Sequence, residues 1–168
     1  MINKVTNIAI NLIIFLIPLL ILPAQIYPTN YNLPKIVLLL VLGLFLLVIL
    51  FIKRKELKFD LIDKTLLAFL FLILLSTIFS VNFSKAIIGE ENRYEGLLAF
   101  IVYFSIYYCA KNFYTYNKNI KYYAIVTISI CSVIGILQYY NVFPLTLLNS
   151  TDISGFTSST FGNRNFFG

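Results

Sequence analysis

The sequence predicts an all-helical, polytopic membrane protein whose transmembrane helices form a single bundle domain over residues 1–168. Hydrophobic residues make up 60% of the chain and charged residues 12%, a composition typical of membrane proteins. The hydrophobic residues fall in long blocks, and a bilayer core about 30 Å thick needs roughly 20 apolar residues per helix. Five blocks approach this length, and we predict five spans with a sixth beginning at the C-terminal end.

The first three spans are marked by their apolar blocks. The first covers residues 5–24 and contains Pro18, which has no N–H and therefore leaves a backbone carbonyl that neighbouring groups must satisfy. The second covers residues 36–52 and is followed by KRKELKFDLIDK, the most basic connection of the chain. The third covers residues 65–81 and leads into NFSKAIIGEENRYEG.

The last two spans are richer in aromatic or polar residues. The fourth covers residues 97–110, and the fifth covers residues 122–140, with tyrosines near the span ends as in an aromatic belt. Cys109 and Cys131 lie inside these spans, where free cysteine behaves as a small hydrophobic residue. The chain has no histidine, and we expect neither a disulfide nor a metal site nor a cofactor.

The basic residues predict the orientation, because cytoplasmic loops of membrane proteins retain an excess of lysine and arginine. The formal charge of +6 therefore has a topological explanation, and we expect no nucleic-acid partner. We predict a cytoplasmic N-terminus in a bacterial cytoplasmic membrane. The predicted inner side carries nine basic residues and the outer side four: Lys4, Lys53, Arg54, Lys55, Lys58, Lys64, Lys111, Lys118 and Lys121 inside, and Lys35, Lys85, Arg93 and Arg164 outside.

Two outer loops concentrate the polar residues that are candidates for chemistry. The segment GEENRYEG at residues 89–96 places Arg93 among three glutamates, and STFGNRNFFG at residues 159–168 places Arg164 between Asn163 and Asn165. An arginine at the outer end of a helix bundle suits a phosphate group, since its planar fork donates two parallel hydrogen bonds and keeps its charge.

Three glycines of these loops support the same interpretation. Gly89, Gly96 and Gly162 would allow close approach of the backbone, and amide groups at a helix start would add to anion binding. A simpler alternative is that Arg93 and Arg164 only mark the membrane interface, extend to water and pair with nearby glutamates.

Together, GEENRYEGLL after the third span and SSTFGNRNFFG after the fifth resemble the O-antigen ligase and polymerase family of bacterial membrane glycosyltransferases. The resemblance covers essentially the whole chain but only the N-terminal part of such proteins, which have about ten to twelve helices and a large late outer loop. It implies inverting transfer of a glycan from an undecaprenyl-pyrophosphate carrier to an acceptor sugar, without a metal, during cell-surface polysaccharide assembly such as that of lipopolysaccharide.

The resemblance also implies roles for individual residues. Arg93 corresponds to a pyrophosphate contact, in a loop shaped by Tyr94, Glu95 and Gly96 together with Gly89. Arg164 is a second pyrophosphate contact at a position where the family often has proline, and Gly162, Asn163 and Asn165 fit the motif as parts of a helix start. The family's assisting residue, often a histidine of the late loop, has no counterpart here. We expect no catalytic residue in these 168 residues and no activity from them alone.

Two other classes of function remain open at this stage. A transporter of lipid-linked glycans would also need outer arginines, but transporters usually place ionisable groups at mid-membrane depth. The predicted span cores contain none, and their polar residues, such as Ser76, Thr77, Ser80 and Gln138, are typical of helix packing. A non-enzymatic membrane module would predict no role for Arg93 in lipid binding.

Overall fold

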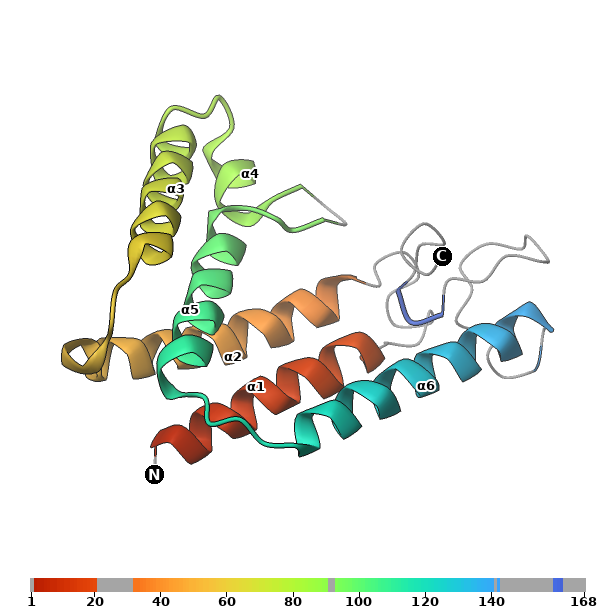
Figure 1. Ribbon diagram of the computed structural model, residues 1–168. Helices are drawn as coiled ribbons and strands as arrows, with labels where there is room; N and C mark the ends of the chain where they lie inside the picture. Colours follow the sequence, from red (N-terminus) through yellow and green to blue (C-terminus); the bar gives the residue numbers. More distant parts are fainter. Residues whose placement is uncertain (1, 21–31, 91–92, 141, 143–158, 162–168) are drawn as a thin grey trace. The chain divides into compact units, whose positions relative to one another are not determined.

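The computed structural model describes residues 2–20, 32–90, 93–140, 142 and 159–161, and all regular structure within these ranges is helical (Figure 1). This confirms the predicted all-α class. The elements in chain order are α1 (Ile2–Leu19), α2 (Asn32–Ile52), the 3₁₀ helix η1 (Arg54–Glu56), α3 (Leu61–Ile78), α4 (Phe83–Ile88), α5 (Leu97–Phe113) and α6 (Asn119–Tyr139).

Three helices among the described residues, α2, α3 and α6, are long and apolar enough to cross a membrane. The other two predicted spans coincide with the shorter apolar helices α1 and α5, whose crossing of the membrane stays a prediction. The predicted sixth span lies outside the described residues. The short helix α4 within the loop after α3 was not predicted, and it begins where the Asn82 side chain accepts a hydrogen bond from the Lys85 N–H at 3.2 Å.

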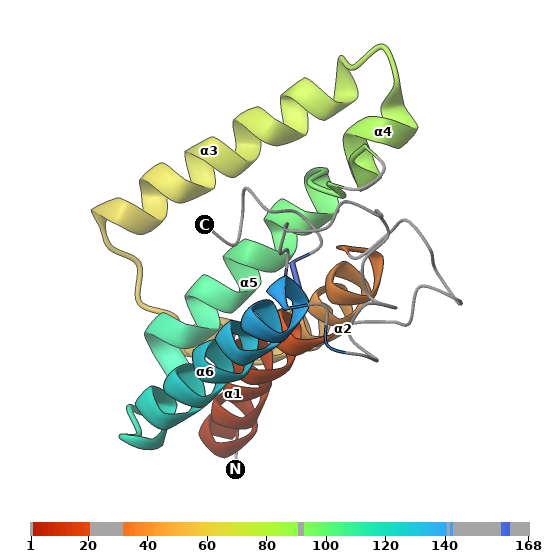
Figure 2. The same ribbon diagram turned by 90° about the vertical axis from the view of Figure 1, so that its right-hand side faces the viewer.

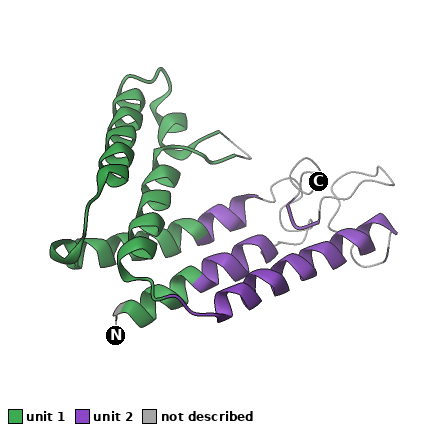
Figure 3. Cartoon of the chain, viewed as in Figure 1, with its two compact units in different colours: residues 1–10, 39–115 green, residues 11–38, 116–168 purple. Residues whose placement is uncertain are grey.

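The chain divides into two compact units, shown in different colours in Figure 3. The first combines residues 1–10 with 39–115, and the second combines residues 11–38 with 116–168, so that α1 and α2 each contribute to both. That the two units form the single predicted domain stays a prediction.

Close packing in the first unit depends on a glycine where α2 meets α5. A Cβ atom added at Gly43 would lie 2.2 Å from Cγ1 of Val102, so only glycine permits this approach. About one turn along α2 and two turns along α5, the buried Cys109 thiol donates to the Leu46 carbonyl at 3.4 Å. Small residues at such contacts are typical of membrane helices, where dispersion contacts replace hydrophobic burial as the main attraction between helices.

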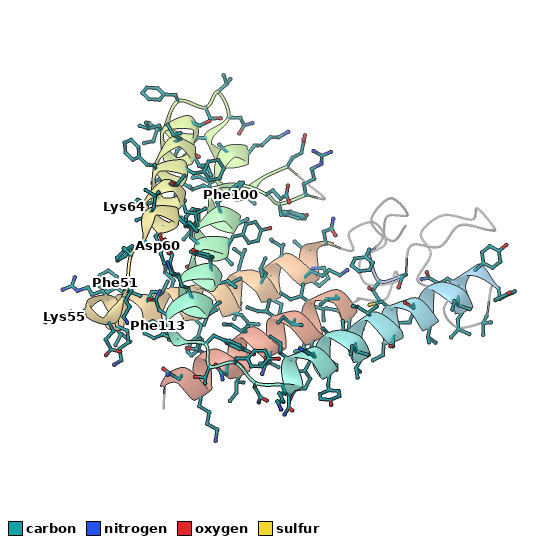
Figure 4. The ribbon with its side chains drawn as sticks, in the orientation of Figure 1. Phe51, Lys55, Asp60, Lys64, Phe100 and Phe113 are labelled. Atoms are coloured by element: carbon teal, nitrogen blue, oxygen red, sulfur yellow. The ribbon has the colours of Figure 1, made fainter. Side chains whose placement is uncertain are left out.

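The helices α3, α4 and α5 pack against one another in the first unit (Figure 2). The rings of Phe69 in α3 and Phe100 in α5 meet edge to face with centroids 6.1 Å apart, and Phe100 is labelled in Figure 4. Edge-to-face contact between aromatic rings is favourable beyond the area that it buries.

A polar network joins the first turn of α3 to the last turn of α5. Asp60 and Asp63 form a reciprocal cap, in which each carboxylate accepts the backbone N–H of the other residue, at 2.9 and 2.7 Å. Asp63 is fully buried and also accepts the Tyr107 hydroxyl at 3.2 Å, while its carbonyl accepts the Tyr108 hydroxyl at 3.0 Å. The Lys111 ammonium pairs with both carboxylates.

This network explains why α3 begins at Leu61, earlier than the predicted span at residue 65. Charged residues do not extend an apolar span, but the first turn of a helix has unpaired N–H groups that carboxylates satisfy. A buried carboxylate is costly unless it is paired and hydrogen-bonded, and the contacts of Asp63 meet both conditions.

The exposed pair of Asp60 and Lys111 should make stability depend on pH. The hydrogen bond from Lys111, 2.7 Å long, lowers the pKa of Asp60, and the Asp63 N–H lowers it further. A carboxyl whose pKa is lowered by folding stabilises the protein above its unfolded pKa of about 3.9, and this contribution disappears as the pH falls through the folded pKa.

We therefore expect Asp60→Asn to lower the midpoint of thermal unfolding in detergent at neutral pH, because asparagine keeps the helix cap but loses the charge. The loss should be small and weakened by salt, since the pair is exposed. The difference from wild type should narrow as the pH falls below the unfolded pKa of about 3.9 and through the lowered folded pKa of Asp60. Equal midpoints at neutral pH, or a difference that persists in acid, would contradict this account.

Candidate functional site

The predicted loop GEENRYEG connects α4 to α5 in the first unit. Gly89 ends α4 with a φ of 96°, a left-handed conformation that glycine adopts at no steric cost, and its N–H donates to the Lys85 carbonyl at 2.8 Å. Gly96 is the N-cap of α5 and its carbonyl accepts the Ala99 N–H at 3.0 Å. The loop therefore lies between two helix ends that glycines define.

The two glycines bring the ends of the loop into backbone contact. A Cβ atom added at Gly96 would lie 2.3 Å from the Ile87 carbonyl oxygen and 2.4 Å from the Gly89 nitrogen. A Cβ atom added at Gly89 would lie 2.4 Å from the Glu95 nitrogen. The sequence predicts close backbone approach at these glycines, and in the structure the approach is between the two ends of the loop itself.

Arg93 lies at the exposed turn of this loop. The N–H groups of Arg93 and Tyr94 both donate to the Glu90 carbonyl, at 3.1 and 2.9 Å, and Tyr94 has a left-handed φ of 55°. Of the two loop glutamates that the structure describes, Glu90 pairs with Lys85 at 3.5 Å, and neither Glu90 nor Glu95 forms an ion pair with Arg93. The Arg93 side chain therefore extends from a tight turn, and the hydrogen bonds of that turn fix the Arg93 backbone.

A small cleft lies beside this loop, between the C-terminal end of α3 and the N-terminal end of α5. Its volume is about 210 Å³, and its walls combine apolar residues such as Ile73 and Phe100 with Ser76, Thr77, Ser80, Glu95 and Gly96. Hydroxyls and a carboxylate in a small cleft suit a polar ligand with several hydroxyl groups of its own.

From the sequence, these hydroxyl residues are expected only to be packing groups. For Thr77 the structure agrees in part, since its hydroxyl donates to the Ile73 carbonyl of its own helix at 2.9 Å. Ser76 lies in the last turn of α3, whereas Ser80 follows the C-cap Phe79 and donates its hydroxyl to the Asn82 carbonyl at 3.3 Å. The two serines therefore share no face of the helix that the sequence could have signalled.

The second motif is described only in part, and Gly162, Asn163, Arg164 and Asn165 lie outside the described residues. Just before them, the turn at residues 159–161 is buried in the second unit, with Ser159 and Thr160 both fully inaccessible.

Side-chain and backbone groups of α2 and α6 fix this turn. The Ser159 hydroxyl donates to the Cys131 carbonyl at 2.6 Å, and the Gln138 amide donates to the Ser159 carbonyl at 3.1 Å. The Lys35 ammonium donates to the Thr160 carbonyl and lies 5.0 Å from the centroid of the Phe161 ring. The segment leading to the predicted GNRN motif is thus a buried turn held by polar contacts.

The described residues contain no group of three or more His, Cys, Asp or Glu side chains that could hold a metal ion. What the first-unit site offers is one exposed guanidinium, a neighbouring carboxylate and a set of hydroxyls. Such groups can bind an anion and form hydrogen bonds with a sugar. We assign no proton-transfer step to them.

No protein-family model matches the chain, and neither the curated proteins nor the solved structures include a significant match. The resemblance of the two arginine motifs to O-antigen ligases and polymerases therefore stays a hypothesis.

We expect Gly96→Ala to open the loop, because the new methyl group would overlap the backbone of Ile87 and Gly89. Overpacking of this kind costs about 1–3 kcal/mol, and here the backbone must move to relieve it. Limited trypsin digestion in detergent should cleave after Arg93 several-fold faster than in wild type. Ser84→Ala, an exposed change in α4, is the control and should leave the rate unchanged. Equal rates for Gly96→Ala and wild type would show that the contact between the glycines does not constrain the loop.

Proposed function

We propose that this chain is the N-terminal part of an integral-membrane glycosyltransferase of the O-antigen ligase or polymerase type. The complete enzyme moves a glycan from undecaprenyl pyrophosphate to an acceptor sugar on the outer face of the bacterial cytoplasmic membrane. The part proposed for these 168 residues is to bind the donor. The observation that carries the proposal is the exposed Arg93 on a loop closed by two glycines, next to a cleft whose walls include Glu95 and three hydroxyl-bearing residues.

The chemistry of the loop supports a pyrophosphate ligand. A guanidinium remains charged at all relevant pH values and binds two phosphate oxygens at once. Glu90 is engaged by Lys85, so that this carboxylate does not neutralise Arg93. The Gly96 N-cap adds no side-chain acceptor to the start of α5, whose positive dipole end favours an anion.

Glu95 adds a hydrogen-bond acceptor for sugar hydroxyls to the site. A carboxylate opposes a bare anion but accepts hydrogen bonds from sugar hydroxyls, and Glu95 shares the wall of the cleft with Ser76 and Ser80. In the proposed arrangement, the pyrophosphate contacts Arg93 while the first sugar of the glycan contacts the cleft. The two halves of the donor would then be separated along the loop.

Donor binding of this kind contributes to glycosyl transfer by stabilising the leaving group. Negative charge grows on the pyrophosphate as its bond to the sugar breaks, and a fixed guanidinium stabilises that charge where it develops. The resemblance assigns activation of the acceptor hydroxyl to a late outer loop of the family, so that we assign no general base to this chain.

The distribution of charge favours this function over transport. The ionisable residues inside the three membrane-length helices lie within the first turn or two, as with Lys35 in α2 and with Asp63 and Lys64 in α3. Proton and ion relays need such groups near the middle of a helix. The described helices place them where they cap, pair or reach the membrane surface.

The direct test is the affinity of the chain, reconstituted in nanodiscs, for undecaprenyl pyrophosphate. We expect Arg93→Ala to lose about 1.5–3 kcal/mol, the range for a charge-assisted hydrogen bond, which is a roughly ten- to hundredfold weaker Kd. Arg93→Lys should recover part of the loss, because it restores the charge without the planar fork.

Arg54→Ala is the matched control, since Arg54 is an exposed arginine of η1 that lies on the predicted cytoplasmic side. It should leave the affinity unchanged. The proposed donor site is wrong if the Arg93→Ala variant binds undecaprenyl pyrophosphate as tightly as wild type. It is also wrong if Arg54→Ala loses as much affinity as Arg93→Ala does. Arg93 would then only mark the membrane interface.

A further inference from the structure

A groove at the C-terminal end of α2, within the first unit, has no part in the proposed donor site. Its volume is about 500 Å³, inside the range of about 300–1,000 Å³ that is usual for binding clefts. Phe51 and Lys55, two residues of its walls, are labelled in Figure 4. The walls are two apolar residues from the last turn of α2 and the four charged residues that follow them: Phe51, Ile52, Lys53, Arg54, Lys55 and Glu56.

The charged residues of this groove do not neutralise one another. The Lys53 ammonium pairs with the Glu56 carboxylate, whereas Arg54 and Lys55 form no ion pair with any residue that the structure describes. Arg54 and Lys55 are both exposed, and the exposed Lys58 adds a further positive charge two residues beyond the groove. The groove therefore offers two available cations beside one carboxylate that is already paired.

Exposed apolar surface adjoins these cations. Phe51 is 74% exposed and Ile52 is 68% exposed. The Arg54 guanidinium lies over the Phe51 ring, 5.7 Å from its centroid. A stacked guanidinium keeps the N–H groups at its edge available, and these can bind a carboxylate through two parallel hydrogen bonds. Aromatic residues and arginine are also enriched at the interfaces between proteins.

Hydrogen bonds fix the backbone of the groove. The Lys53 N–H donates to the Ile49 carbonyl, and the Glu56 N–H donates to the Lys53 carbonyl, both at 2.9 Å. Just beyond η1, the Lys58 N–H donates to the side-chain oxygen of Asn112 in α5 at 3.0 Å. A surface that is fixed before binding loses less entropy when a partner docks, so this groove is prepared for recognition.

We infer that this groove binds an acidic segment of a partner protein. Carboxylates of the segment pair with Arg54 and Lys55, and its apolar side chains cover Phe51 and Ile52. The inference goes beyond the proposed function and does not depend on it, because the groove and the donor loop share no residue.

Glu56 favours a protein over an anionic phospholipid, the other ligand that basic residues at the end of a membrane-length helix attract. Its side chain is 55% exposed and lines the groove. A carboxylate opposes an anionic headgroup, whereas a peptide can place a backbone N–H against it. Charges of both signs in one groove also fix the register of a peptide, since misplaced like charges repel each other.

The experiment is a selection of peptides on the full chain in phosphatidylcholine nanodiscs. A display library of random short peptides is first depleted on empty discs and then selected on discs that contain the chain. We expect the selected peptides to be enriched in aspartate and glutamate next to aromatic or aliphatic residues. Dissociation constants of synthetic peptides with the enriched sequence are then measured by fluorescence anisotropy.

Arg54→Gln should weaken the binding of these peptides roughly ten- to hundredfold, the effect of losing a charge-assisted hydrogen bond. Phe51→Ala should weaken it several-fold, because it removes apolar contact and the ring under the guanidinium. Lys121→Gln is the matched control, an exposed lysine of α6 outside the groove, and it should leave the affinity unchanged. Selection without acidic enrichment, equal affinity of Arg54→Gln and wild type, or an equal loss in Lys121→Gln would each overturn the inference.

Native mass spectrometry tests the lipid alternative with the same variants. The chain is released from nanodiscs that contain phosphatidylglycerol and phosphatidylcholine, and the phosphatidylglycerol molecules that stay bound are counted. We expect equal numbers on wild type and on Arg54→Gln. If wild type retains more phosphatidylglycerol than Arg54→Gln does, an anionic lipid occupies the groove and the inference of a protein partner is overturned.

Discussion

A lipid bilayer offers a polypeptide no hydrogen-bond partners, and this constraint determines where the polar groups of the chain lie. In the first unit the buried carboxylate of Asp63 is satisfied by a helix N-terminus, a tyrosine and a lysine at one end of the helices α3 and α5. At the other end, the loop between α4 and α5 closes on its own backbone at Gly89 and Gly96. Because both ends are fixed in this way, the apolar lengths of α3 and α5 separate an ion-pair network from an exposed arginine.

In the second unit, the same constraint acts on an irregular segment, the turn at residues 159–161. Ser159 and Thr160 are buried, which is tolerable only because α6 and Lys35 supply partners for their backbone and side-chain groups. The turn therefore leads into the GNRN motif from a fixed position within its unit. Non-helical backbone is accepted at depth in a membrane protein where protein groups surround it, and such places are often where ligands bind.

Much of the fold follows from the sequence because a bilayer reduces the problem to finding apolar blocks. The helical class was predicted in this way, and each of the five main helices overlaps a predicted span, but most helix ends differ from the predicted ones. The start of α3 depends on a reciprocal cap between Asp60 and Asp63. Hydropathy alone does not predict this start, because two charged residues lower the hydropathy of the segment. The contact between Gly89 and Gly96 could be anticipated as close backbone approach but not located, since it depends on the unpredicted helix α4. The cleft lined by Ser76 and Ser80 was missed because serine in a membrane helix has a sufficient explanation in packing.

The central claim is that the Arg93 guanidinium contacts the pyrophosphate of a polyprenyl carrier. The chain has three arginines, at positions 54, 93 and 164, so their nitrogens can be resolved by isotope labelling. We would measure ³¹P dephasing of ¹⁵N-arginine signals by solid-state NMR, with the chain and undecaprenyl pyrophosphate in bilayers and the Arg93 signal assigned by its loss in Arg93→Lys. The account predicts strong dephasing at Arg93, as expected for nitrogen and phosphate oxygen at hydrogen-bond distance, and none at Arg54. An Arg93 signal that keeps its full intensity would contradict the account.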